Sequence, residues 1–230
     1  MDSYDFIKEG KYKEACDASE KEFQETGVYQ KLIHKALALL NMKQYNETIL
    51  ILERIIANSD FEADYNYSLL GVSKWALKDY KNAFTIWISS LNTAYTDAAG
   101  GIIIPSLIYS GSIINKDPEM KKIAYQKLNK ILKKNSRSFS RTNPNTFPGP
   151  IGAFLINMIE KKDLMNVTSK NKILKQRQLC QVFFYIGIIK YYEKKNKEKA
   201  KKMLENSIKK RDILSPEYYF AQIIVERNFT

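Results

Sequence analysis

The stretch YQKLIHKALALLNMKQYNETILIL, residues 29–52, shares its pattern with DYNYSLLGVSKWALKDYKNAFTIW, residues 64–87, without a gap. The two segments are offset by 35 residues, and the alignment places Ala36 opposite Gly71 and Tyr45 opposite Tyr80. Self-similarity at a period of this size is typical of proteins built from stacked helical hairpins. The sequence therefore predicts that each segment forms a pair of antiparallel helices.

Two weaker copies lie outside this region. The segment EGKYKEACDAS, residues 9–19, matches the second half of the pattern 33 residues earlier. The segment LCQVFFYIGIIKYYEKKNKEKAKKMLENSI, residues 179–208, has Gly187 at a first-helix position and Leu204 at a second-helix position. The hairpin pattern is therefore predicted to begin near the N-terminus and to return near the C-terminus.

The C-terminal segment EYYFAQIIVERNF, residues 217–229, reads as a single capping helix. Ser215 is a suitable N-cap residue, and Pro216 is tolerated at the first helical position. A stack of helical hairpins needs such a helix to cover its last apolar face.

The repeat spacing resembles that of the tetratricopeptide repeat (TPR) family. In residues 64–87 the family's signature positions are held by Tyr67, Leu70, Gly71, Tyr80, Ala83 and Trp87. The weaker copies depart from it, with Lys35 where leucine is usual and Thr48 where alanine is usual. The resemblance implies an all-α fold of about eleven helices, wound as a TPR-like right-handed superhelix of antiparallel pairs. It also implies that Gly71 lets two helices approach closely, with Trp87 filling the space beside it.

The central part of the chain departs from the regular pattern. An uncharged run, AAGGIIIPSLIYSGSII at residues 98–114, precedes a lysine-rich helical stripe and a polar loop at residues 135–149. In NTFPGPIGAFL, residues 145–155, Pro150 suits the start of a helix. Gly152 is expected to pack closely against the repeat that follows. A phosphate-binding loop needs a lysine and a preceding strand, and this segment has neither. It is therefore interpreted as a joint in the helical array.

The central motifs carry a second resemblance, over residues 60–215. AAGGIIIP, PGPIG and RQLCQVFFYIG occur in an order similar to that of a bacterial TPR subgroup, which includes the adaptor lipoprotein for cell-wall hydrolases. The resemblance implies architecture and supplies no active residue. We expect a single helical-repeat domain over residues 1–230, with an N-terminal TPR block at 1–95, an irregular helical segment at 96–170 and a C-terminal block at 171–230.

Charge is distributed unevenly along the chain. The net charge is +12, yet residues 1–100 hold 11 Lys and Arg against 15 Asp and Glu, whereas residues 101–230 hold 26 against 10. A basic half attracts acidic proteins, nucleic acids and anionic surfaces at long range. Only 6 of the 37 basic residues are arginine, which disfavours base reading by bidentate contacts.

The sequence carries no motif that points to catalysis or to metal binding. His34 is the only histidine, and Cys16 and Cys180 lie far apart with no CxxC spacing. We therefore expect no enzyme activity, no metal and no cofactor; a pair of carboxylates from distant positions is the alternative that only the fold can reveal. The run at 98–114 is at the short limit for a membrane span, so no membrane insertion is predicted. The start MDSYDFIKEG lacks an export signal, which favours the cytoplasm.

By resemblance, the first helix of each hairpin lines a concave groove that binds a protein or peptide. The inward positions are Tyr65, Ser68, Val72 and Trp75 in one copy and Gln181, Phe184, Ile188 and Tyr191 in the C-terminal copy. Rigid aromatic side chains such as Trp75 make good interface anchors. The alternative is that these residues pack against neighbouring helices.

A basic patch is the second candidate surface. Its members are Lys130, Lys133, Lys134, Arg137, Arg141, Lys194, Lys195 and Lys197. Such a patch would steer an acidic partner and weaken with salt. The alternative is a solvated turn followed by a polar helix face.

These expectations define a function hypothesis. The chain is predicted to be a non-catalytic scaffold that binds an acidic protein or peptide, as a bacterial toxin-immunity protein or an adaptor. The competing class is a helical-repeat protein that binds RNA or DNA through its basic C-terminal half.

Overall fold

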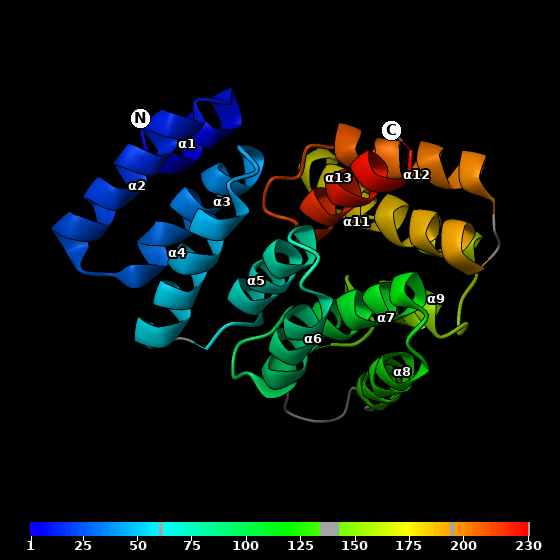
Figure 1. The fold of residues 1–230 in the computed structure, drawn as a ribbon. Coiled ribbons are helices and arrows are strands. Elements are labelled where there is room, and N and C mark those ends of the chain that lie inside the picture. Colours follow the sequence, from blue (N-terminus) through cyan, green and yellow to red (C-terminus); the bar gives the residue numbers. More distant parts are fainter. Residues whose placement is uncertain (60–61, 134–142, 194–195, 230) are drawn as a thin grey trace. The chain divides into compact units, whose positions relative to one another are not determined.

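The structure is a computed structural model that describes residues 1–59, 62–133, 143–193 and 196–229 (Figure 1). Within these ranges the chain is helical without a β-strand, and one isolated bridge joins Ala63 to Tyr95. The prediction of an all-α protein is confirmed. The superhelical arrangement of repeats stays a prediction.

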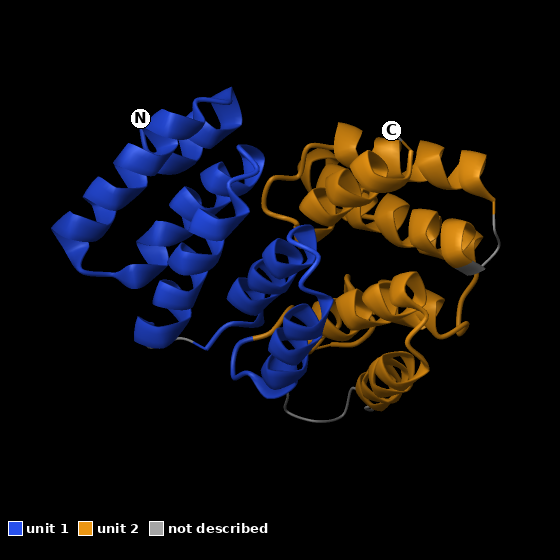
Figure 2. Cartoon of the chain, viewed as in Figure 1, with its two compact units in different colours: residues 1–95 blue, residues 96–230 orange. Residues whose placement is uncertain are grey.

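The described residues form two compact units, residues 1–95 and residues 96–230 (Figure 2). The single domain expected over residues 1–230 stays a prediction. The helices of the first unit are α1 (Ser3–Glu9), α2 (Tyr12–Thr26), α3 (Ile33–Asn41), α4 (Tyr45–Asn58), α5 (Asp64–Ala76) and α6 (Tyr80–Ser89), with short 3₁₀ turns at Tyr29–Leu32 and Ser90–Asn92. Each helix packs against the one that follows it.

A residue in the left-handed backbone conformation follows the end of α1, α3 and α5 in the first unit. Gly10, Lys43 and Lys78 have φ angles of 79°, 60° and 64°, and each lies two residues before the tyrosine that starts the next helix. A left-handed conformation reverses the chain within a few residues. These turns make α1–α2, α3–α4 and α5–α6 hairpins with short connections.

The α5–α6 hairpin is held by a close crossing at Gly71. A Cβ atom built on Gly71 would overlap the indole ring of Trp87, which is fully buried. The indole Nε1 donates to the carbonyl oxygen of Ser68 at 3.4 Å. Gly71 therefore gives Trp87 its place in the core, as the sequence predicts.

The second unit contains the remaining helices. They are α7 (Ile103–Asn115), α8 (Pro118–Leu132), α9 (Gly149–Leu155), α10 (Lys161–Asn166), α11 (Lys172–Ile188), α12 (Lys197–Lys209) and α13 (Pro216–Asn228), with a π-helical turn at Ile189–Glu193. Helices α7 and α8 form one hairpin, and α11 and α12 form another against which α13 packs. At the α11–α12 crossing a Cβ on Gly187 would lie 2.9 Å from Leu204 Cγ. Helix α13 begins at Pro216, as predicted.

The predicted joint contains α9, and part of the loop expected at 135–149 lies outside the described residues. A Cβ on Gly152 would lie 3.0 Å from Ile102 Cδ1 and 3.0 Å from Leu128 Cδ2. The expectation that Gly152 packs closely against the following repeat is therefore wrong, because its nearest neighbours belong to the preceding α7 and α8 region. The joint folds back onto the hairpin before it.

Helix α7 contains most of the uncharged central run and is 13 residues long. Among the described residues, no helix combines the length and the apolar character needed to cross a bilayer.

Candidate functional site

The groove positions predicted on α5 lie largely in the core of the first unit. Ser68 and Val72 are fully buried, Trp75 is 2% exposed, and Tyr65 is half-buried. The Trp75 ring packs against Tyr80, Phe84 and Trp87 with centroid separations of 4.6, 5.7 and 5.8 Å. Helix α5 lies between α4 and α6, so most of its surface is covered.

The groove positions on α11 and just after it are distributed in the same way. Phe184 and Ile188 are fully buried, and Phe184 packs against Tyr185 and Phe220. Gln181 and Tyr191 are half-buried, and the Tyr191 ring lies 5.0 Å from that of Phe229. The structure thus corrects the assignment of five residues as partner-facing, because the chain's own helices cover the side chains of Ser68, Val72, Trp75, Phe184 and Ile188.

The predicted basic patch divides into described and undescribed members. Lys130 and Lys133 at the end of α8 and Lys197 at the start of α12 are exposed. Figure 1 shows α8 and α12 on separated sides of the second unit, so the structure does not bring these lysines together. The other members, Lys134, Arg137, Arg141, Lys194 and Lys195, lie outside the described residues.

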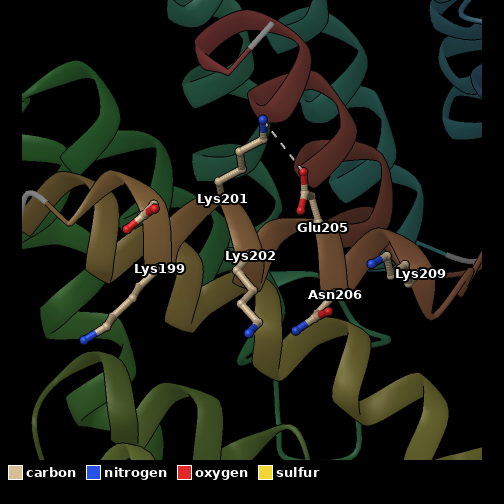
Figure 3. Close-up of a pocket in the computed structure, with 7 residues that line it drawn as sticks. Lys199, Lys201, Lys202, Glu205, Asn206 and Lys209 are labelled. Atoms are coloured by element: carbon tan, nitrogen blue, oxygen red, sulfur yellow. Dashed lines mark ion pairs between the residues drawn. The ribbon is translucent and has the colours of Figure 1, made fainter.

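A stripe of side chains on α12 forms a basic surface (Figure 3). Exposed Lys199, Lys202 and Lys209 follow one another at spacings that place them on one helix face with Asn206. We call these four residues the α12 lysine face. They contribute to a surface hollow of about 540 Å³, together with Glu198, Lys201 and Glu205. Lys201 and Glu205 are 4.0 Å apart, so this pair is partly neutralised.

The opposite side of α12 explains why this face points outward. Ala200, Leu204 and Ser207 are fully buried, and their spacing forms the apolar stripe of an amphipathic helix. The Ser207 hydroxyl donates to the carbonyl oxygen of Cys180 on α11 at 2.7 Å. The packing of α12 on α11 therefore fixes the lysine face toward solvent.

A buried carboxylate joins α13 to α11, and the sequence did not single it out. Glu217 is fully buried. It accepts hydrogen bonds from the Tyr185 hydroxyl at 2.8 Å, the Ser215 hydroxyl at 2.5 Å and Gln181 Nε2 at 3.2 Å. Burial, together with the Glu217 carboxylate, raises the pKa of Tyr185 well above its ordinary value. Glu217 and Tyr185 are fully buried, so this cluster holds α13 on α11.

Two titratable groups next to this cluster, Cys180 and Asp212, have raised pKa values. Burial raises the pKa of the Cys180 thiol to about 12, so the reactive thiolate is suppressed. Burial also raises the pKa of Asp212 to about 6, against the effect of Arg177 at 4.0 Å. Cys180 is fully buried, and the Asp212 side chain is only 10% exposed.

The glycine-rich loop before α7 is closed around a carboxylate of the chain itself. Asp97 accepts hydrogen bonds from the backbone N–H groups of Ala99, Gly101, Ile102 and Ile103, at 2.5–3.1 Å. Gly100 and Gly101 have φ angles of 95° and 93°, which turns successive N–H groups inward. Burial raises the pKa of Asp97, and the four N–H groups oppose this rise. The loop is an anion-binding nest that is already filled.

His34 lies within the first unit and has a defined partner. Its Nδ1 is 2.7 Å from the hydroxyl oxygen of Ser3, and its ring stacks on Tyr4 at 5.5 Å. Burial lowers the pKa of His34 below its ordinary value, more than Glu22 and Asp2 raise it. The neutral ring is thus favoured in the folded state, and the contact fixes α1 on α3.

The environment of His34 predicts a pH dependence of stability. Below pH 6.5, the ordinary pKa of histidine, the unfolded chain binds the proton more readily than the folded chain. The contribution of His34 to stability is therefore present above this pH and is lost as the pH falls toward the folded pKa. Urea unfolding between about pH 7.5 and pH 5 should show a smaller decrease for His34→Gln than for the wild type. Equal decreases in the free energy of unfolding of the two proteins would contradict this role of His34.

Neither a metal-binding cluster among the described residues nor a match to known proteins points to a function. Among these residues, no group of three or more His, Cys, Asp or Glu side chains is arranged to hold a metal ion. Comparison with protein-family models, with curated proteins and with solved structures finds no significant match.

Proposed function

We propose that this chain is a non-catalytic, TPR-like helical scaffold that binds an acidic protein segment on the α12 lysine face. The observation that carries the proposal is the exposed stripe of Lys199, Lys202 and Lys209. The lysines of this surface outnumber the two carboxylates, Glu198 and Glu205, that line the same hollow, so a row of carboxylates on a partner would neutralise the remaining positive charge. This surface replaces the aromatic groove, whose main side chains are buried.

The charge of the surrounding chain supports the same partner class. Residues 101–230 carry 26 basic against 10 acidic residues, so the long-range field of this part attracts acidic partners. Long-range attraction raises the association rate, and the ordered lysine stripe supplies the short-range contact.

Local geometry supports the TPR-like part of the proposal. Lys43 and Lys78 are separated by the 35-residue offset of the sequence alignment, and both are left-handed. Gly71 faces Trp87 in one hairpin, and Gly187 faces Leu204 in another. Repeated hairpins with small residues at their crossings are what the family resemblance implies. Such a scaffold suits an adaptor or a toxin-immunity protein.

The proposal predicts the effect of removing the stripe. Lys199→Ala/Lys202→Ala/Lys209→Ala should weaken binding of a fluorescent oligoglutamate peptide about tenfold in an anisotropy titration, since three exposed ion pairs contribute about 0.5 kcal/mol each. The matched control is Lys13→Ala/Lys31→Ala/Lys81→Ala, which removes three exposed lysines from the first unit. Equal losses in both variants would indicate a nonspecific charge effect and contradict the site.

The same titration tests the nucleic-acid alternative, which the basic second unit also favours. A single-stranded oligonucleotide of the same net charge as the peptide serves as the competing probe. Tighter binding to the oligonucleotide, with a steep log-linear dependence on salt, would replace the protein partner with nucleic acid. Tighter binding to the peptide would support the scaffold.

A further inference from the structure

The start of α11 projects from the second unit. All eight residues from Lys170 to Arg177 are exposed, although α11 continues into the core from Cys180 onward. Two adjacent aliphatic side chains lie in this segment: Ile173 is 67% exposed and Leu174 is 47% exposed. Val167, at the end of α10, is 46% exposed. Apolar side chains that gather at one place on a surface are candidates for an interaction site.

Hydrogen bonds join two residues of α11, near the end of this exposed segment, to the chain connections on either side of the helix. Gln176 Nε2 donates to the carbonyl oxygen of Lys210, on the connection from α12 to α13, at 2.8 Å. Gln178 Oε1 accepts from the backbone N–H of Ser169 at 2.6 Å. Ile173 shares a helix face with Gln176, and Leu174 shares one with Gln178. The two aliphatic residues therefore project beyond the connections on either side of them.

Basic side chains accompany the aliphatic ones. Lys170, Lys172 and Lys175 are exposed within the same segment, and Arg211 is exposed next to the Lys210 carbonyl that Gln176 binds. Within the described part of the chain, none of these four forms a salt bridge. The nearby Asp212 is paired with Arg177, and its side chain is only 10% exposed. We call Val167, Ile173, Leu174 and these four basic residues the α11 tip.

We propose that the α11 tip binds the surface of a bilayer that contains anionic lipid, with Ile173 and Leu174 entering the headgroup region. Apolar side chains flanked by lysines are the composition of segments that lie at the membrane interface. The lysines would remain in contact with the headgroups while the aliphatic residues leave water. A peptide partner is less well suited, because anchors of protein interfaces enter desolvated pockets, whereas these side chains stand out from the surface.

The proposal goes beyond the scaffold function and is tested separately from it. Full-length protein is sedimented with large vesicles of two compositions. One is phosphatidylcholine alone, and the other contains about 30% phosphatidylglycerol, which gives the vesicle a clear negative surface potential. The wild type should bind only the anionic vesicles. Lys170→Ala/Lys172→Ala/Lys175→Ala should reduce the partition coefficient about 100-fold at low salt, since each lysine near an anionic surface contributes about fivefold.

The aliphatic residues are tested by Ile173→Ser/Leu174→Ser, which keeps every charge. We expect about a tenfold loss of vesicle binding, because two partly exposed aliphatic side chains no longer leave water. The control is Leu50→Ser, because Leu50 is 66% exposed in the first unit and matches Ile173 in exposure. Circular dichroism verifies that each variant is folded.

Three outcomes would overturn the proposal. These are an absence of wild-type binding to anionic vesicles, unchanged binding by the serine variant, and an equal loss in Leu50→Ser. Loss of oligoglutamate binding in the serine variant, with vesicle binding intact, would assign the tip to a protein partner instead. The triple alanine variant of the α12 lysine face should keep most vesicle binding, so failure of the scaffold proposal and failure of this one give different results.

Discussion

Trp87→Ala is expected to lower the free energy of unfolding of the first unit by about 4 kcal/mol. The Trp87 side chain is fully buried and packs on Trp75 and Phe84, with ring centroids 5.8 and 6.0 Å apart. Its removal leaves a large cavity at the crossing of α5 and α6, where the glycine at position 71 has no side chain to fill it. Trp75, the only other tryptophan, reports unfolding of this unit by fluorescence in urea.

A double-mutant cycle with Gly71 shows whether the crossing has the geometry described. In the wild-type background, Gly71→Ala should cost about 2 kcal/mol, because the new methyl group overlaps the Trp87 ring. In the Trp87→Ala background the methyl group enters an empty space, and its cost should fall close to zero. Equal costs in the two backgrounds would contradict direct contact between these positions.

Glu217→Ala is expected to lower the stability of the second unit by about 3 kcal/mol. The Tyr185 and Ser215 hydroxyl groups and the Gln181 amide lose their shared acceptor inside the protein. Leaving buried donors without a partner costs more than the net energy of the bonds themselves. Unfolding is followed by near-ultraviolet circular dichroism and compared with tryptophan fluorescence, which reports residues 1–95 alone because both tryptophans lie there.

Two further variants separate the hydrogen bonds from the packing. Glu217→Gln keeps the size of the side chain and one carbonyl acceptor, so it should cost about half as much as the alanine variant. Tyr185→Phe should cost less in the Glu217→Ala background than in the wild type, because its partner is already gone. The tryptophan fluorescence transition of the first unit should not change in any of these proteins. Additive costs would mean that Tyr185 and Glu217 do not act as a pair.

Much of the helical architecture could be predicted because its signals are local. The 35-residue offset between 29–52 and 64–87 predicts two helical hairpins, and the α3–α4 and α5–α6 hairpins lie at these positions. Gly71 and Trp87 are only 16 positions apart, and a small residue opposite a large one within a hairpin is a pattern that a single sequence can show. The start of α13 is also local, since Pro216 occupies the first helical position, although the Ser215 hydroxyl donates to Glu217 and does not cap the helix.

The candidate site could not be predicted in the same way, because it depends on which helix faces are covered by neighbouring helices in the folded chain. Helical periodicity shows that Val72 and Trp75 lie on an apolar face, but a core face and a binding face have the same composition. Both residues are buried in the structure. The Tyr185–Glu217 bond joins positions 32 residues apart, and no spacing rule links them. The exposure of Ile173 likewise depends on which part of α11 is covered by other helices, and the sequence alone does not show this.

The filled nest at Asp97 has a consequence for competition among anions. Because the carboxylate is tethered two to six residues from the N–H groups that bind it, its effective concentration there is about millimolar or higher. A dissolved phosphate or nucleotide would have to displace this built-in competitor from a buried loop. The N–H groups before α7 are therefore occupied by the chain's own carboxylate, and a dissolved anion binds there only if it displaces Asp97.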